Sequence, residues 1–290
     1  IFDLKKLSVE QLMEVEVTSA SRSEEALAAV PAALVVVTSE DIRRPGATSV
    51  PEALRLQPGV HVARQSSSTW AVSARGFSSL NSEKLLVMSD TRSMYTPLFS
   101  GVFWDVQNYV LQDIERIEVI RGPGATLWGS NAVNGVVNIT TKSARDTQGL
   151  YVMAMTGSEE RATAAIRYGG QLSATGHYRV FAKFADRDGT FHPGIDHDDG
   201  WRMGHGGIRA DWETSSTDTL TLQAGAYAGE IGQVRPSHSV SGRPGPLPVH
   251  RGTDRRLGDS QHLRGLALPA GRPGRAVGRS LAGHRAKGAG

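Results

Sequence analysis

The densest group of residues with the potential for metal chemistry is a run of His and Asp side chains in one polar stretch. It comprises His192, Asp196, His197, Asp198 and Asp199. Imidazole nitrogens and carboxylate oxygens together can bind a divalent metal ion. The stretch lacks the fixed spacing of a metal motif, so we expect a solvated polar loop here and no metal site.

Catalytic arrangements are missing from the sequence. The chain has no cysteine, which excludes disulfide scaffolds, Cys-based zinc sites and thiol catalysis. Residues 122–126 read Gly-Pro-Gly-Ala-Thr, but they lack the Gly-Lys-Ser/Thr ending and the following helix of a phosphate-binding loop. No Ser/His/Asp arrangement and no paired carboxylates occur elsewhere. We therefore expect neither an enzyme nor a bound cofactor.

The charge is spread unevenly along the chain. The net charge of +3 comes from residues 243–290, which hold 10 Lys and Arg against 2 acidic residues. The preceding blocks, 1–146 and 147–242, are both slightly acidic. Basic character that is confined to a tail does not indicate a nucleic-acid-binding domain, and we expect no nucleic-acid partner.

The remaining general signals concern membranes and processing. No window reaches 18 uninterrupted apolar residues, which excludes a transmembrane helix. The chain begins at Ile1 without a basic and then apolar leader. We therefore expect a processed product or a fragment.

Residues 1–146 have the pattern of a small mixed α/β unit. Ser8-Val9-Glu10-Gln11 is a capping-box pattern that predicts a short first helix. The pattern predicts further short helices over 40–43, capped by Ser39, and 50–56. Short apolar runs predict strands over 34–38, 71–73, 85–88, 117–120 and 136–140. These runs are too short to form the wall of a barrel.

The pattern changes near Gly149 to five segments of about ten residues, the length of a tilted membrane-spanning strand. Four of the segments alternate between apolar and polar residues. In one, Ala162, Ala164, Ile166 and Tyr168 face away from Arg161, Thr163 and Arg167. A soluble sandwich alternates in the same way, so periodicity alone leaves sandwich and barrel open.

The lengths of the connections favour a barrel. The links near 172–176 and 214–217 are short, whereas the link over 186–202 is long and polar. If the first strand rises from the periplasmic side, both short turns are periplasmic and the long link is extracellular. Outer-membrane barrels have this distribution of loop lengths.

The last residues, 233–290, lack any sustained period. From residue 243 onward they are rich in Gly, Arg, Pro and Ala and contain no aromatic residue. Such a composition cannot bury enough apolar surface to fold. We expect a disordered tail, either a solvated basic segment or an out-of-frame translation of a GC-rich coding sequence.

Four ordered blocks resemble the plug domain of TonB-dependent outer-membrane receptors. The most specific block runs from Ile114-Glu115-Arg116-Ile117-Glu118-Val119-Ile120-Arg121-Gly122-Pro123 through Trp128-Gly129-Ser130-Asn131 to Asn138-Ile139-Thr140-Thr141-Lys142. Upstream blocks at 54–62, 74–77 and 85–95 agree with it. One position departs from the family, which usually has Asp-Gly-Arg where this chain has Asp90-Thr91-Arg92. A β-branched residue would be strained there if the backbone keeps a positive φ.

The resemblance implies an α+β plug domain followed by antiparallel β-strands of a transmembrane β-barrel in the outer membrane of a Gram-negative bacterium. We expect an N-terminal helix with a TonB-box-like segment over 1–19, the plug over 20–146, about five barrel strands over 147–232 and the tail over 233–290. Five strands cannot close a barrel, so the wall is incomplete. The implied function is import of a scarce ligand such as a ferric siderophore, with TonB and outer-membrane lipid as partners. A soluble periplasmic interaction module made of the plug alone is the alternative.

The resemblance also implies roles for individual residues. Glu14-Val15-Glu16-Val17-Thr18 resembles the TonB box, the segment that TonB captures by strand addition; a plain linker is the alternative. Arg75, Glu118 and Arg121 are expected to hold the plug against the barrel wall; surface arginines at strand ends are the alternative. Gly76, Gly122, Gly129 and Gly135 are expected to permit tight turns and close backbone packing.

Overall fold

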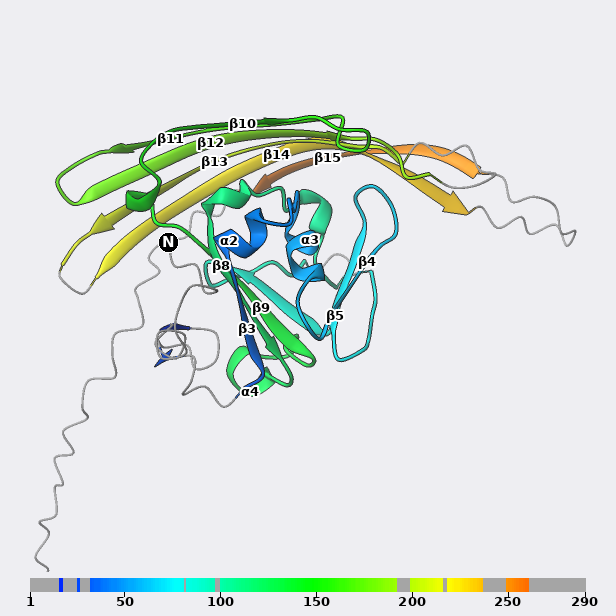
Figure 1. Ribbon diagram of the computed structural model, residues 1–290, viewed down its shortest axis with the longest axis horizontal. Coiled ribbons are helices and arrows are strands. Elements are labelled where there is room, and N and C mark those ends of the chain that lie inside the picture. Colours follow the sequence, from blue (N-terminus) through cyan, green and yellow to red (C-terminus); the bar gives the residue numbers. More distant parts are fainter. Residues whose placement is uncertain are drawn as a thin grey trace, which may run out of the picture.

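The computed structural model describes residues 16–17, 25–26, 32–80, 82–96, 100–191, 199–215, 218–236 and 249–260. It has two parts: a plug (residues 34–142) and a curved antiparallel sheet that covers one side of it, here called the wall (Figure 1). The helix expected near Ser8 and the residues His192, Asp196, His197 and Asp198 lie outside the described residues.

The plug is built around a mixed five-stranded sheet in the order β3-β8-β9-β6-β7. Its strands are β3 (Leu34–Thr38), β8 (Ile114–Arg121), β9 (Gly135–Thr141), β6 (Leu85–Ser89) and β7 (Arg92–Ser93). Strands β6 and β9 are parallel, and the other neighbours are antiparallel. A separate hairpin is formed by β4 (Val60–Arg64) and β5 (Trp70–Ala74).

Short helices complete the plug: α2 (Ser39–Arg43), α3 (Val50–Arg55), α4 (Ala125–Trp128) and the 3₁₀ turns η3 (Trp104–Val106) and η4 (Leu111–Asp113). A further 3₁₀ turn, η5 (Arg145–Thr147), lies in the link from the plug to the wall. The N-cap of α2 is Thr38, whereas the sequence analysis expected Ser39. Thr38 has the acidic residue Asp41 three positions on, and the two exchange hydrogen bonds in a capping box.

One apolar core fixes these elements. Helix α3 buries Val50, Ala53 and Leu54 against the two sheets. Buried residues of the strands form the rest of the core. They include Val37, Val72, Val87, Ile117, Val119, Val137 and Ile139. The plug therefore has a packed core of its own, which holds its polar side chains in place.

The wall has six strands in sequence order, each antiparallel to the next. They are β10 (Gly149–Met155), β11 (Ala162–Gln171), β12 (Gly176–Arg187), β13 (Trp201–Glu213), β14 (Thr219–Pro236) and β15 (Val249–Ser260). No helix among the described residues is long and apolar enough to cross a membrane.

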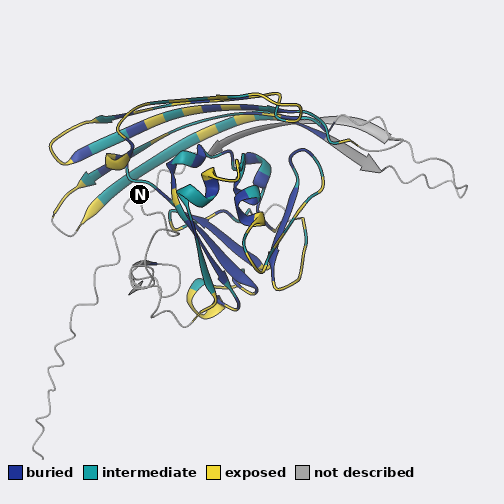
Figure 2. Cartoon of the chain, viewed as in Figure 1, coloured by how far each residue is buried: buried dark blue, intermediate teal, exposed yellow. Residues whose placement is uncertain are grey.

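The apolar face of the wall points outward, away from the plug. Leu150 and Val152 are 66% and 62% exposed, and Ile166, Tyr168 and Phe184 are also exposed. The polar faces of the same strands are buried, which gives the alternation visible in Figure 2. A soluble sandwich would bury its apolar faces instead. The alternation is therefore that of an outer-membrane barrel wall.

The connections also follow the expected order. The turns after β11 and β13 lie at the end of the wall where the chain enters from the plug, and the link between β12 and β13 lies at the opposite end (Figure 1).

The tail differs from the expectation of disorder from residue 233 onward. Strand β14 continues to Pro236, and residues 249–260 pair with it along twelve positions as β15. A ladder of main-chain hydrogen bonds does not require apolar side chains, and the edge of β14 offers unpaired donors and acceptors. Composition alone therefore missed this strand.

Candidate functional site: the seam between plug and wall

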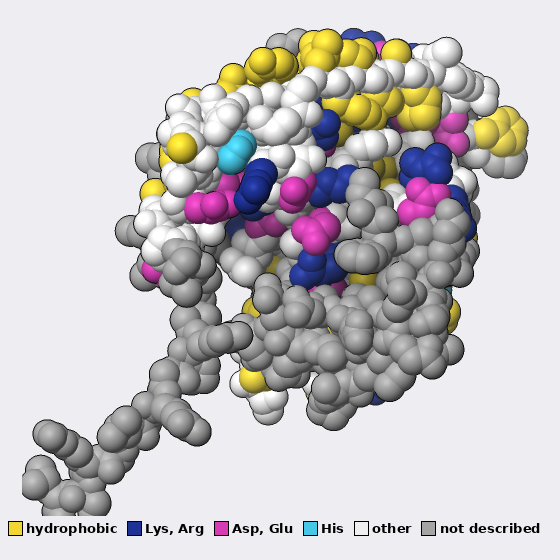
Figure 3. Space-filling view, turned by 60° about the vertical axis from the view of Figure 1, so that its left-hand side comes forward, with side chains coloured by type: hydrophobic (Ala, Val, Ile, Leu, Met, Phe, Trp, Pro, Cys, Tyr) yellow, Lys and Arg dark blue, Asp and Glu magenta, His cyan; other side chains and the backbone are white. Residues whose placement is uncertain are grey.

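The polar faces of plug and wall meet along one seam. Figure 3 shows basic and acidic side chains mixed together below the apolar outer surface of the wall. Several buried charged residues lie on this seam, including Asp113 of the plug and Arg179, Lys183 and Arg187 of the wall. Buried charges are tolerated when they are paired and hydrogen-bonded.

Asp113 forms the first charge cluster. It ends η4 on the plug and forms an ion pair with Arg167 of β11. The guanidinium of Arg179 on β12 lies 3.9 Å from the same carboxylate. Arg179 also donates to the Lys142 carbonyl at 2.7 Å. The single carboxylate of Asp113 thus balances the charge of two wall arginines. At the same place, burial lowers the pKa of Lys142.

Asp90 forms the second cluster, next to the first. Its carboxylate accepts hydrogen bonds from the Thr141 main chain and hydroxyl, both at 2.8 Å, and from Gln223 of β14 at 3.0 Å. Arg209 of β13 lies 3.7 Å away. Asp90 itself sits in a tight turn with Thr91, where φ is 45° and 68°. The turn thus keeps the positive φ that the family sequence suggests, with a threonine in it.

Asp211 of β13 ties the wall to the end of the plug. Its carboxylate accepts from the main-chain N–H of Ala144 at 2.7 Å and from Arg209 at 2.9 Å. The Thr221 hydroxyl of β14 donates to it at 2.7 Å. The link from plug to β10 is therefore fixed by a wall carboxylate.

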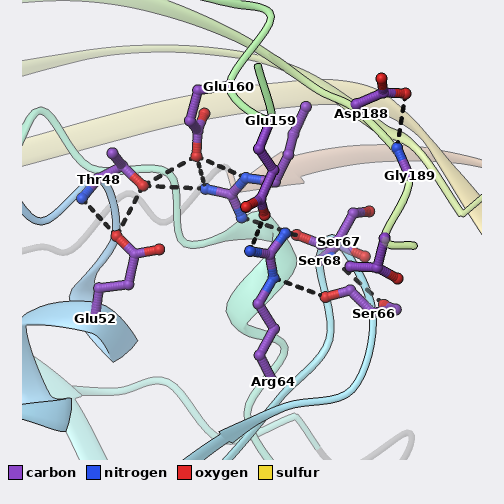
Figure 4. A network of polar contacts seen from close by, with 12 residues as sticks. Thr48, Glu52, Arg64, Ser66, Ser67, Ser68, Glu159, Glu160, Asp188 and Gly189 are labelled. Carbon is purple, nitrogen blue, oxygen red and sulfur yellow. Dashed lines mark hydrogen bonds and ion pairs between the residues drawn. The ribbon is translucent and has the colours of Figure 1, made fainter. Parts of the chain in front are cut away.

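A third cluster lies toward the other end of the wall and is drawn in Figure 4. Arg187 of β12 donates to Glu160 in the β10–β11 turn at 2.7 Å and to the main-chain carbonyl of Ser67 at 2.8 Å. The Thr48 hydroxyl donates to Glu52 at 2.9 Å and lies 3.0 Å from Glu160. Arg187 also donates to the Thr48 hydroxyl at 3.2 Å, so this wall arginine contacts two separate parts of the plug.

In the same cluster, residues of the wall and its connections bind the tip of the β4–β5 hairpin. Arg64 forms an ion pair with Glu159. The main-chain N–H of Ser67 donates to Asp199 at 3.1 Å, and that carboxylate also accepts from Thr190. Ser67 is fully buried as a result.

Between the clusters, wall side chains contact plug main chain. Lys183 donates to the Tyr109 carbonyl at 2.7 Å, and the His205 ring lies 3.1 Å from the Asn108 carbonyl. Burial raises the pKa of the Tyr109 phenol to about 12, although its hydrogen bond with Ser89 acts in the opposite direction. Phe181 packs edge-on against His205.

Comparison with known proteins identifies the plug. The TonB-dependent Receptor Plug Domain matches residues 26–136. A vitamin B12 transporter of Vibrio vulnificus is 30% identical over 186 residues, which cover 61% of this chain and 30% of that transporter. A second one, of Vibrio cholerae, is 31% identical over 172 residues. The chain carries the plug domain of TonB-dependent receptors over residues 26–136. It spans about a third of the length of these relatives.

Solved TonB-dependent receptors share the fold. A variant of the ferric enterobactin receptor of Pseudomonas aeruginosa superposes with a TM-score of 0.53 at 24% identity, covering 72% of this chain and 35% of that one. The ferripyoverdine receptor of the same organism gives 0.60 at 19% identity, covering 81% and 31%. At these identities the likeness concerns the fold alone.

The three residues expected to hold the plug against the wall make their described contacts within the plug. Glu118 is fully buried inside the plug and pairs with Arg116 at 2.7 Å. Arg121 donates to the Pro58 carbonyl at 3.0 Å, and the Arg75 guanidinium lies beside Gly122. The contacts described for these three residues are within the plug, because β5 and β8 end on its side away from the six wall strands.

The four glycines occupy positions that suit glycine. Gly76, Gly122 and Gly129 have φ of 94°, 145° and 92°, which other residues rarely adopt. At Gly135 a Cβ atom would overlap the Ile120 carbonyl oxygen of the neighbouring strand. Glycine suits this position because the two backbones approach each other closely.

The TonB-box-like segment of the receptor is described only at two residues. Glu16 and Val17 form β1 (Glu16–Val17), which pairs antiparallel with β2 (Glu25–Ala26), and Val17 is fully buried. Glu14, Val15 and Thr18 lie outside the described residues. Over the described ranges, no three His, Asp or Glu residues are grouped as metal ligands would be.

Sequence reasoning noticed the seam arginines as polar-face residues but gave them no role. The signal was present, because Arg167, Arg179 and Arg209 occur on the polar faces of three consecutive strands. Their partners, Asp90 and Asp113, lie in separate plug segments, and only the folded plug brings them to the same height of the wall.

Proposed function

We propose that this chain provides the plug and the first wall strands of a receptor that imports a scarce, bulky ligand across the outer membrane of a Gram-negative bacterium. One observation carries the proposal: the plug lies on the polar face of an antiparallel wall whose other face is apolar and exposed. That arrangement suits lipid on one side and a filled lumen on the other.

The chemistry of the seam suits a plug that moves. Ion pairs and hydrogen bonds join plug and wall at Asp90, Asp113 and Glu160. Water can replace such contacts at modest cost when the plug shifts. An apolar seam of the same area would have to expose its surface to water at about 25 cal/mol per Å².

Energy for the movement would come from TonB. The outer membrane has no nucleotide supply, so work must arrive through physical contact with an inner-membrane partner. Residues 14–18 offer a β-favouring strand ahead of the plug, and strand addition is the proposed mode of capture.

Two ligand classes are candidates. A ferric siderophore is the first, in keeping with the ferric enterobactin and ferripyoverdine receptors that share the fold. A corrinoid is the second, because the relatives at 30% and 31% identity are named as vitamin B12 transporters.

The test is uptake by cells that lack their own receptors for both ligands and express the gene that encodes this chain. Radioiron-labelled siderophore and radiocobalt-labelled cyanocobalamin are supplied separately, with and without TonB. We expect TonB-dependent accumulation of one of them. Recovery of the chain in the soluble periplasmic fraction, with neither ligand accumulated, would support the plug-only interaction module instead.

A further inference from the structure

A small cavity lies within the seam, next to the cluster of Figure 4. Its volume is about 20 Å³, which holds about one water-sized particle. The plug contributes Ser49, Ser68, Trp104 and Asn108 to its lining. The wall contributes Lys183, Arg187 and Trp201.

The lining contains an unusual concentration of unpartnered hydrogen-bond donors. Ten buried side-chain polar atoms have no hydrogen-bond partner among the described residues, and five of them line this cavity. They are Trp104 Nε1, Trp201 Nε1, Asn108 Nδ2, Ser49 Oγ and Ser68 Oγ. Four of these side chains belong to residues at least nine-tenths buried, so bulk water does not serve them. A buried donor without a partner costs free energy, and five around one cavity indicate a bound acceptor.

The charge of the lining points in the same direction. Lys183 is buried and donates to the Tyr109 carbonyl. Within the described residues it forms no ion pair with a carboxylate, whereas the neighbouring Arg187 pairs with Glu160. Asp105 and Glu160 also line the cavity, but Glu160 is engaged by Arg187 and Thr48. A buried ammonium group without a counter-charge is costly.

The number of donors distinguishes an anion from a water molecule. Indole and amide N–H groups can only donate. A single water accepts about two hydrogen bonds and has two of its own to donate, so three N–H groups and an ammonium exceed its capacity. A monoatomic anion accepts from all of them.

We propose that this cavity is a binding site for a single small monovalent anion, with chloride as the abundant candidate. Donors from both parts surround the site, Trp104 and Asn108 from the plug and Lys183 and Trp201 from the wall. The anion therefore joins plug to wall, in addition to the direct hydrogen bond from Lys183 to the Tyr109 carbonyl. This site is independent of which ligand the receptor imports.

The two tryptophans make the site measurable. The full chain in detergent is titrated with sodium bromide in a chloride-free gluconate buffer of constant ionic strength, and tryptophan fluorescence is followed. Bromide quenches indole at contact, so a bound ion gives a saturable decrease. Chloride, which quenches little, should displace it and shift the bromide midpoint to higher concentration.

Lys183→Met should weaken bromide binding about tenfold or more, because it removes a charge-assisted partner worth about 1.5–3 kcal/mol. Lys84→Met is the matched control, since Lys84 is an exposed plug lysine outside the cavity. If Lys183→Met does not fold, Asn108→Leu and chloride competition in the unsubstituted chain serve the same purpose.

Quenching that rises linearly with bromide, is indifferent to chloride and is the same in all variants would overturn the proposal. It would mean collisional quenching only and a cavity that holds water. Diffraction from bromide-soaked crystals gives an independent check, with an anomalous peak expected between Trp104 and Trp201.

Discussion

Arg179 of β12 and Arg209 of β13 lie directly opposite each other in the register of the wall, and both donate to the same oxygen, the Thr141 hydroxyl of the plug, at 3.1 and 2.7 Å. Like charges opposite each other on neighbouring strands are destabilising. Here the plug compensates, with Asp113 near Arg179 and Asp90 near Arg209. The charge pattern of the wall is therefore complete only with the plug in place.

The first prediction removes one of these plug charges. Asp113→Asn leaves Arg167 and Arg179 buried on the seam without a counter-charge, and breaking a buried pair typically costs about 3–5 kcal/mol. We expect that loss in the free energy of unfolding in detergent, with faster amide exchange in β8 and β9. Asp146→Asn is the control, since Asp146 is exposed and bonds only Ser143. Equal stability of the two variants would show that the plug does not depend on the seam charges.

A second prediction concerns alkaline pH. Burial raises the pKa of Tyr109 to about 12, above the value of about 10 for an exposed tyrosine. The folded state thus favours the neutral phenol. This stabilisation is complete below about pH 10 and is lost as the pH rises through about 12. Tyr109→Phe should therefore flatten the fall in stability over this range, as followed by denaturant titrations at fixed pH. An unchanged pH profile in Tyr109→Phe would assign the alkaline loss to other groups.

Part of this fold follows directly from the sequence. Alternation in Ala162–Gln171 and Gly176–Arg187 predicted the strands and the separation of their apolar and polar faces, because period two is a local property of the chain. The N-cap of α2 was misplaced by one residue, since Ser39 and Thr38 both suit a cap and only the partner Asp41 decides. The seam could not be predicted, because Asp113 and Arg167 are 54 residues apart and their meeting depends on how the plug docks.

A third prediction tests the turn at Asp90 and Thr91. Thr91 is exposed and has a φ of 68°, a conformation that costs a β-branched residue about 1–2 kcal/mol. Thr91→Gly should raise the free energy of unfolding by about 1 kcal/mol, while keeping the Asp90 contacts with Thr141. Ser93→Gly, two residues on in strand β7, should lower it by about 0.5–1 kcal/mol, because glycine weakens an ordinary strand position. A loss of stability in Thr91→Gly would mean that the threonine side chain is needed there.

A fourth prediction tests close packing at Gly135. A methyl group at this position would meet the main-chain carbonyl of Ile120 on β8, which cannot move without breaking the β8–β9 ladder. Gly135→Ala should cost about 3 kcal/mol or more, at the upper end of overpacking effects. Gly204→Ala in β13 is the matched control, because the nearest atom to its added carbon is 3.7 Å away. Similar unfolding midpoints for both variants would exclude the packing role of Gly135.

The last prediction concerns energy coupling at Glu14–Thr18. The main chain of Glu16 and Val17 is paired with Ala26 and Glu25, so capture by TonB must compete with this internal pairing. The apparent affinity then falls in proportion to the fraction of open segment.

Because of this competition, substitutions in β1 and in β2 should change the affinity for TonB in opposite directions. Val17→Pro removes an N–H and fixes φ, so it should abolish strand addition and weaken binding of a periplasmic TonB fragment to the full chain. Ala26→Pro disrupts only the internal partner and should strengthen the same binding. Val17→Ala should have a smaller effect than Val17→Pro, because the main chain supplies most of the affinity. Calorimetry or fluorescence anisotropy can rank the four proteins. Equal affinity of all four for the TonB fragment would identify residues 14–18 as an ordinary linker and would remove the proposed route by which energy reaches the plug.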